Sequence, residues 1–230
     1  MTPLQLLGLL GVFAVARFAL SSKPFRGAGP HGSAVAVVRE YLDALIVAGL
    51  AALLLIAFVI RTYYIPSISM IPTLTVHDVL LVDQMAYRFG HPHPGDVAVF
   101  MPPVPSEGNA FVKRVVGVPG DTIGISDGIV YRNGNALTEP YENQQPKYDL
   151  EIKNYEIYVD GQPLDPKTAD VPPRRLWQAP NRIPDGFYFM LGDNRNYSDD
   201  SHVWGFAQGK NMTGRAFLIL WPFNRMRVLK

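Results

Sequence analysis

The chain has 230 residues, enough for one domain of ordinary size together with membrane segments or an insertion. Its 21 basic and 20 acidic residues leave a net charge of +1, so no strong positive field attracts nucleic acid. The absence of cysteine excludes disulfides, thiolate metal sites and a cysteine nucleophile.

Residues 1–61 are predicted to form a membrane anchor with two spans. Residues 42–60 are apolar apart from Asp43, and a spanning helix needs about 20 such residues to cross a hydrocarbon core of about 30 Å. Residues 3–20 form the other span, although two polar residues interrupt it. A cleaved signal peptide is the alternative for this run, but its positive residues follow the apolar stretch instead of preceding it.

The loop between the two runs, residues 21–41, sets the predicted orientation. It carries three basic residues against one acidic residue, and short loops with a basic excess stay in the cytoplasm. The N-terminus and everything after Arg61 would therefore lie outside the cytoplasm.

From about residue 78 onward, the sequence predicts short β-strands. Runs rich in β-branched residues end at turn signals such as Pro-Gly-Asp and Asn-Gly, which favour hairpins. Residues 139–186 are polar, proline-rich and less periodic, and apolar strand patterns return after them. We therefore predict a mainly β fold, in which a β body of residues 62–123 and 187–230 accepts a small inserted β subdomain of residues 124–186.

Two serines lie in the stretch PSISM, residues 66–70. Local rules favour structural roles: Ser67 follows a proline in a turn, and Ser69 would cap a helix that begins near Met70. A nucleophilic serine would instead require a base that takes its hydroxyl proton. Ser69 lies eight residues past Arg61, so any chemistry there stays within about 28 Å of the predicted span.

The histidines do not supply that base. His77 and Asp78 are adjacent in sequence, so their side chains diverge in a strand or a turn. His91, His93 and Asp96 could suggest a metal site, but prolines break the spacing between them and no helical pair exists. We therefore predict no metal.

Lys113 is the better candidate for the base. In AFVKRVVGV, strand alternation places it between Phe111 and Val115 on one face and places Arg114 on the other face. If the first face is buried, desolvation disfavours the charged amine and lowers the pKa of Lys113, so that its neutral form can accept a proton. The alternative is an edge lysine whose amine extends to solvent.

A dense polar loop, MLGDNRNYSDDSHVWGF at residues 190–206, indicates either ordinary turn chemistry or a polar network behind an active site. Together with PSISMIPTL, HPGDVAVF and FVKRVVGVPGD, in this order and after two apolar runs, it resembles the bacterial type I signal peptidases, the leader peptidases with a Ser/Lys dyad. The resemblance runs from about Tyr63 to the C-terminus. Four motifs in the right order are specific, whereas any one alone is weak.

The resemblance implies a serine endopeptidase with a role for each matching residue. Ser69 would be the nucleophile. Lys113 would be its general base and would later activate the water that hydrolyses the acyl-enzyme. Ser67 through its hydroxyl and Ser69 through its own backbone N–H would form the oxyanion hole. Ser198 would orient the Lys113 amine.

The resemblance also implies a supporting network, in which Asp193 would pair with Arg114 and Asp200 would support the loop. His202 stands where an arginine usually pairs with that second aspartate. An imidazole, with an ordinary pKa of about 6.5, is a weaker and pH-dependent partner. Ile68 stands where glycine is common, at a position that varies.

The implied substrates are secretory preproteins, cleaved after small residues at −1 and −3 without a cofactor. The residues lining shallow apolar pockets for those small residues would be Ile65, Met70, Leu74, Val112 and Tyr63. The resemblance further implies a multi-pass monomer in the bacterial inner membrane, with the lipid bilayer as a partner and the catalytic domain on the periplasmic side. Trp221 and Phe223 could dip into the membrane interface, although a core strand end is an equal alternative.

Two other functions remain open. A self-cleaving Ser/Lys peptidase of the repressor type would use the same dyad, but two spans and no DNA-binding element argue against it. A membrane-anchored extracytoplasmic β-domain that binds partners without catalysis would make Ser69 a cap and Lys113 a surface residue.

Overall fold

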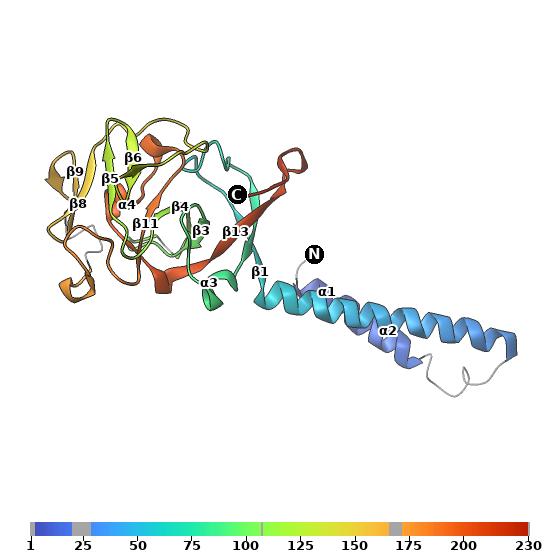
Figure 1. Ribbon diagram of the computed structural model, residues 1–230. Helices are drawn as coiled ribbons and strands as arrows, with labels where there is room; N and C mark the ends of the chain where they lie inside the picture. The colour runs from blue at the N-terminus through green and yellow to red at the C-terminus, as the bar shows by residue number, and fades with distance from the viewer. Residues whose placement is uncertain (1–2, 20–28, 107, 166–171, 230) are drawn as a thin grey trace. The chain divides into compact units, whose positions relative to one another are not determined.

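The structure is a computed structural model that describes residues 3–19, 29–106, 108–165 and 172–229 (Figure 1). The chain divides into two compact units, Met1–Arg61 and Thr62–Lys230. The described part of the first unit is almost entirely helical, and the second unit is built mainly from strands.

Two helices make up the first unit, α1 (Pro3–Ala19) and α2 (Gly29–Phe58). Leu10 of α1 is buried and packs against Gly49 of α2, where any Cβ would clash with the leucine side chain. Arg17 donates from Nε to Asp43 Oδ1 at 2.7 Å. A glycine contact and an ion pair therefore hold the two helices together.

The prediction of two N-terminal transmembrane helices is wrong. Among the residues that the structure describes, no helix is long and apolar enough to cross a membrane. Helix α1 has 17 residues, about 26 Å at a rise of about 1.5 Å per residue, which is shorter than a hydrocarbon core of about 30 Å. In α2, the part after Asp43 covers only about 22 Å before the helix ends at Phe58.

The chain leaves the helix before the predicted second span ends. The apolar run extends to Ile60, but that residue already belongs to strand β1 (Ile60–Tyr64). Hydropathy counts apolar residues whatever their backbone conformation, so the apolar run 42–60 includes Ile60, which belongs to a β-strand. The predicted multi-pass topology has no support in the described part of the chain, and Lys23 and Arg26, on which its orientation depends, lie outside that part.

The larger sheet has eight strands in the order β1-β2-β13-β3-β4-β11-β12, with β14 paired to β13. After β1, its strands are β2 (Val79–Asp83), β3 (Val97–Phe100), β4 (Phe111–Gly117), β11 (Phe187–Leu191), β12 (Ala207–Gln208), β13 (Met212–Trp221) and β14 (Arg227–Val228). The pairs from β2 to β12 are all antiparallel. The long strand β13 shifts register against its neighbours, and such bulges bend a strand, so the sheet curls (Figure 1).

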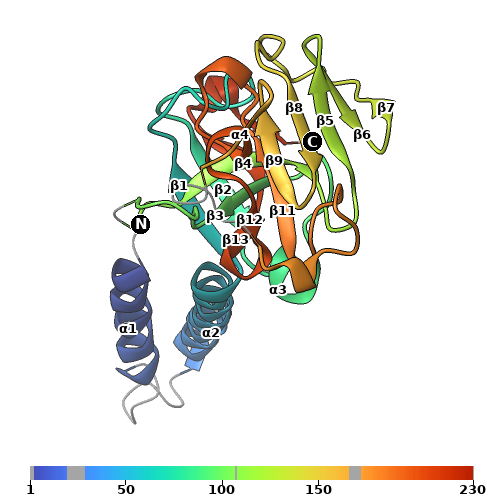
Figure 2. The ribbon, with the colours of Figure 1, turned by 90° about the vertical axis from the view of Figure 1, so that its left-hand side faces the viewer.

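The smaller sheet has six strands in the order β10-β9-β8-β5-β6-β7. Figure 2 labels its strands from β5 to β9. Its strands are β5 (Ile123–Ser126), β6 (Ile129–Arg132), β7 (Asn135–Ala136), β8 (Leu150–Lys153), β9 (Glu156–Val159) and β10 (Gln162–Pro163). Two-residue turns at 127–128, 133–134, 154–155 and 160–161 join successive strands, and both residues of each turn have positive φ. Asn-Gly and Asp-Gly pairs adopt this conformation readily, so the Asn-Gly signal of the sequence is the β6–β7 turn.

The two sheets share a hydrophobic core. Val116 of β4 and Phe189 of β11 lie in one buried cluster with Ile125 of β5 and Ile152 of β8. The chain from Thr62 onward is therefore one compact unit, and its division into a body and an inserted subdomain stays a prediction. The short helices of this unit are α3 (Ala86–Phe89), α4 (Ser201–Trp204), and the 3-10 helices η2 (Arg174–Leu176), η3 (Arg195–Tyr197), η4 (Gly209–Asn211) and η5 (Phe223–Arg225).

Candidate active site

Ser69 lies in a series of turns between β1 and β2 and is 8% exposed. Leu74 N–H donates to Met70 O at 2.8 Å, but the turns do not continue into a helix. Ser69 is therefore not a helix cap, in contrast to the local expectation. Ser67 Oγ lies 3.2 Å from Ser69 Oγ, so two hydroxyls meet at this point.

The loop of residues 192–200 packs against the Ser69 turn. Asn194 donates from its backbone N to Ser69 O and from Nδ2 to Ile68 O, each at 3.1 Å. A Cβ at Gly192 would lie 2.5 Å from Ser69 O and 2.6 Å from Ser198 Cβ, so only glycine fits there. Ser69 and Ser198, which are far apart in the sequence, therefore both adjoin one glycine.

Lys113 lies on β4 and is 4% exposed. Burial lowers the pKa of Lys113 to about 8, because the charged amine loses its hydration, and this effect outweighs the carboxylates of Asp200, Asp199 and Asp193, which raise that pKa. At such a pKa roughly a tenth of the amine is neutral at pH 7, so a base is available.

The position of β4 in the sheet explains this burial. It pairs with β3 on one side and with β11 on the other, so Lys113 is not on an edge strand. Phe111 and Val115 belong to one hydrophobic cluster and Val116 to another, as strand alternation requires. Lys113 Nζ lies 5.8 Å from the centroid of the Phe111 ring. Phe111 is therefore an apolar neighbour of the amine on its own face.

Ser198 is 6% exposed, and its Oγ is buried without a hydrogen-bond partner among the described residues. Buried hydroxyls are nearly always paired, because an unpaired one loses its bond to water without replacement. The Ser198 hydroxyl is therefore able to form a hydrogen bond that the described residues do not supply.

On the opposite face of β4, Arg114 forms a bidentate ion pair with Asp193. Nε donates to Oδ1 at 2.8 Å and NH2 to Oδ2 at 2.7 Å, and the two side chains are at most 2% exposed. Arg114 also donates to Gly95 O at 2.7 Å, and Thr73 donates to Asp193 from Oγ1. Because Thr73 follows the Ser69 turn, the pair joins that turn to β4 and to the 192–200 loop.

Asp200 is buried at the N-terminus of α4. Its carboxylate accepts hydrogen bonds from Gly192 N at 2.8 Å and from His202 N at 3.2 Å. His202 Nδ1 lies 2.6 Å from Asp200 Oδ1, and the imidazole stacks on Tyr148 with 4.2 Å between ring centroids. The histidine therefore contacts Asp200 directly, at the position where the resemblance implies an arginine.

The five residues predicted to line substrate pockets meet in one hydrophobic cluster. Ile65, Met70 and Leu74 are at most 3% exposed, whereas Tyr63 and Val112 are only partly buried. The five residues therefore pack together, and their role as a substrate pocket stays a prediction.

Three buried polar residues of the site were missed by the sequence reasoning: Asn194, Arg195 and Glu139. The first two stand in the polar loop that the sequence singles out, but Glu139 lies in the predicted insertion. Arg195 donates to Glu139 from NH1 at 2.8 Å and from NH2 at 2.7 Å, and both side chains are at most 2% exposed. The two residues are 56 positions apart, so no local pattern could pair them.

The other candidates of the sequence lie elsewhere. His77 Nδ1 contacts the Tyr64 hydroxyl, and Asp78 accepts from Arg225 Nε at 2.9 Å. Within the ranges that the structure covers, no group of three or more His, Asp or Glu residues could hold a metal ion.

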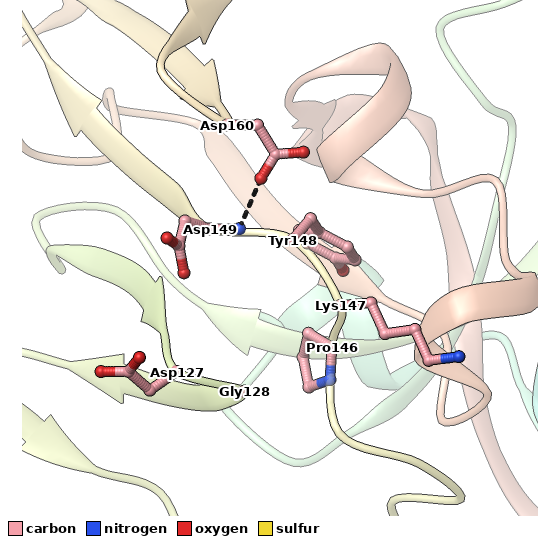
Figure 3. Close-up of a pocket in the computed structure, with 7 residues that line it drawn as sticks. All are labelled: Asp127, Gly128, Pro146, Lys147, Tyr148, Asp149 and Asp160. Atoms are coloured by element: carbon pink, nitrogen blue, oxygen red, sulfur yellow. Dashed lines mark hydrogen bonds between the residues drawn. The ribbon is translucent and has the colours of Figure 1, made fainter.

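A surface cavity of about 250 Å³ lies at turns of the smaller sheet (Figure 3). It is lined by Asp127, Gly128, Pro146, Lys147, Tyr148, Asp149 and Asp160. The carboxylate of Asp160, one of three that line the cavity, accepts a hydrogen bond from Asp149 N at 2.9 Å and so already stabilises the fold. The cavity contains none of the residues predicted for catalysis, and it lacks a serine.

The model of the family described as signal peptidase, peptidase S26, matches residues 38–221. A probable signal peptidase I-1 of Synechocystis sp. is 39% identical, over 82% of this chain and 85% of its own length. The signal peptidase I of Leptolyngbya laminosa is 37% identical, over 74% of this chain and 72% of its own. The signal peptidase I of Pseudomonas aeruginosa is 34% identical, over 76% and 70% respectively. The matched residues include the whole site described above.

Proposed function

Because this chain belongs to the signal peptidase family, peptidase S26, we propose that it removes N-terminal signal peptides from exported preproteins with a dyad of Ser69 and Lys113. The observation that carries this assignment is the burial of Lys113, which lowers its pKa to about 8. The 192–200 loop, whose carboxylates raise the pKa of that amine, also binds the backbone of Ser69.

The first half of the reaction forms an acyl-enzyme. Neutral Lys113 accepts the proton of Ser69 Oγ while Oγ attacks the scissile carbonyl carbon, and the carbonyl oxygen becomes an oxyanion. The backbone N–H of Ser69 and the hydroxyl of Ser67 donate to that oxyanion, and each such donor is typically worth about 10²–10³ in rate. The 3.2 Å between the two hydroxyl oxygens supports the place of Ser67 in this role.

The second half releases the product. The ammonium of Lys113 returns its proton to the leaving amine, which becomes the N-terminus of the mature protein. Lys113, neutral again, takes a proton from water, whose oxygen attacks the ester of Ser69, and Ser69 recovers its proton as the signal peptide leaves. The unpaired Ser198 hydroxyl supports a role in orienting the Lys113 amine. The bonds of Asp193 to Arg114 and of Asp200 to Gly192 support roles in holding the loop.

We also propose that the protein prefers small residues at −1 and −3 of the preprotein. The support is the burial of Ile65, Met70 and Leu74, which leaves little depth between Tyr63 and Val112. A large residue would have to displace buried core side chains, and overpacking of that kind is costly. Cleavage of preproteins with Ala or Leu at −1 tests this preference, and equal rates would contradict it.

The location that we propose is the lipid surface of the bacterial inner membrane, on the extracytoplasmic side where preproteins emerge, with the protein acting as a monomer. Trp221 and Phe223 support the lipid contact, because they are 48% and 68% exposed and their rings pack together where β13 ends. Aromatic residues of this kind favour the headgroup region. Changing both to serine should weaken binding to phospholipid vesicles, and unchanged binding would contradict this contact.

The test of the dyad uses Ser69→Ala and Lys113→Ala, each assayed for cleavage of a preprotein in detergent. Both should abolish cleavage and leave the circular dichroism spectrum intact. Matched controls are Ser126→Ala and Lys153→Ala, because in the smaller sheet Ser126 is exposed and Lys153 is half exposed. Near-wild-type cleavage by either dyad variant would overturn the assignment of the dyad. Absence of cleavage by the wild-type protein would instead favour the partner-binding β-domain.

A further inference from the structure

The segment of residues 139–143, between β7 and β8, makes three contacts around the site, two with the 192–200 loop and one with Arg114 of β4. The first is the ion pair of Glu139 with Arg195, which is bidentate and excluded from water. Arg195 also donates from Nε to Gly192 O at 3.1 Å. Glu139 therefore holds the guanidinium, and the guanidinium holds the backbone of the glycine that separates Ser69 from Ser198.

The second contact is made by Tyr141. Its ring centroid lies 3.7 Å from Arg114 Cζ, close enough for a cation–π interaction with the guanidinium that binds Asp193. The Tyr141 hydroxyl donates to Glu139 Oε1 at 3.1 Å. The Glu139 carboxylate thus binds both Arg195 of the 192–200 loop and the hydroxyl of Tyr141, whose ring covers Arg114.

The third contact leads to the nucleophile itself. Asn143 donates from its backbone N to Asp193 O at 3.0 Å and from Nδ2 to Asn194 Oδ1 at 3.2 Å. Asn194 in turn donates to Ser69 O and Ile68 O. Hydrogen bonds therefore run without a gap from the 139–143 segment to the backbone of Ser69.

On the basis of the proposed Ser69–Lys113 dyad, we infer that the 139–143 segment is a positioning element of this enzyme, which fixes the nucleophile backbone through the 192–200 loop. Glu139, Tyr141 and Asn143 touch no reacting atom, so they act only through Arg195, Arg114 and Asn194. The predicted insertion is then part of the catalytic machinery and not only an addition to the surface.

Loss of the contacts that Glu139, Tyr141 and Asn143 make should lower kcat more than it changes KM. Displacement of a nucleophile by about 1 Å can cost about 100-fold in rate, whereas residues far from the substrate leave its affinity unchanged. A loosened 192–200 loop would also admit water to Lys113. Desolvation is the largest influence on that amine, so its pKa would rise when water enters. Water would also weaken the effect of the three loop carboxylates, but this opposing change is the smaller one.

The test compares Glu139→Gln with Glu151→Gln, which breaks an exposed ion pair with Lys153 in the same predicted insertion. We expect Glu139→Gln to lower kcat by about 10- to 100-fold, with KM within about threefold and the acid limb of the kcat/KM profile moved to higher pH. Glu151→Gln should match the wild type. An unchanged kcat and acid limb in a folded Glu139→Gln protein, or a raised KM alone, would overturn the inference.

If Glu139→Gln does not fold, Asn143→Ala tests the inference instead. The Asn143 side chain is exposed, and its loss removes its hydrogen bond to Asn194, one of those that lead to Ser69. A kcat lower by about three- to tenfold with an unchanged melting temperature supports the positioning role of the 139–143 segment, and a wild-type kcat refutes it. Failure of the dyad itself is recognised separately, because Ser69→Ala would then still cleave.

Discussion

The burial of Lys113 should cost the folded protein stability, and Lys113→Met is the variant that measures this cost. The pKa of Lys113 is about 8, against 10.5 for a free lysine. At about 1.36 kcal/mol per pH unit, this difference corresponds to about 3 kcal/mol. Methionine has a similar length and no charge, so the variant removes the cost without leaving a large cavity.

The pH window follows from the direction of the pKa change. Below pH 8 the amine is charged in both the folded and the unfolded chain, so the folded state bears the whole cost. Between about pH 8 and 10.5 the unfolded chain binds more protons, so wild-type stability rises with pH. Above that window both forms are neutral and the cost disappears.

Urea unfolding in one detergent at pH 7 and pH 10.5 tests this reasoning. We expect Lys113→Met to exceed the wild type by about 3 kcal/mol at pH 7 and by far less at pH 10.5, with no cleavage activity at either pH. Lys153→Met is the matched control, because that lysine is half exposed and should show no such difference. A variant that is no more stable at pH 7, or a gain that does not depend on pH, would refute the account of the base.

Three further predictions follow from the site. Wild-type kcat/KM should rise with pH and level off above about pH 8, because only the neutral amine of Lys113 accepts the Ser69 proton, and a fall between pH 7 and 8 would contradict this. Ser198→Ala should lower kcat by about 10- to 100-fold with little change in melting temperature, and wild-type kcat would remove Ser198 from the site. Asp193→Asn should lower the free energy of unfolding by about 3–5 kcal/mol, since Arg114 stays buried without its counter-ion. A loss of less than about 1 kcal/mol in urea titration would show that this pair is dispensable.

Local reasoning succeeded where a short stretch of chain decides its own conformation. The Asn-Gly pair at 133–134 forms a two-residue turn because both positions need positive φ. Alternation along β4 separated Lys113 from Arg114, because successive side chains of any strand point to opposite faces. The family was also predicted from the order of four motifs, and the comparisons confirm it.

Local reasoning failed where the backbone changes conformation within an apolar run. Residues up to Ile60 look alike in hydropathy, yet α2 ends at Phe58 and β1 begins at Ile60. Ser69 likewise fits the pattern of a helix cap, but Asn194 binds its carbonyl and the chain continues in turns. For Ser69, the partner lies more than a hundred residues away in the sequence.

The sequence by itself determined the family, the strands and hairpin turns, and the candidates Ser69 and Lys113, because each depends on residue types at short spacing. Only the tertiary structure decided how deeply Lys113 is buried, and therefore the direction of its pKa. It also decided that Glu139 binds Arg195, 56 positions away. Burial and ion pairing depend on which distant segments the fold brings together, and a local pattern carries no information about those contacts.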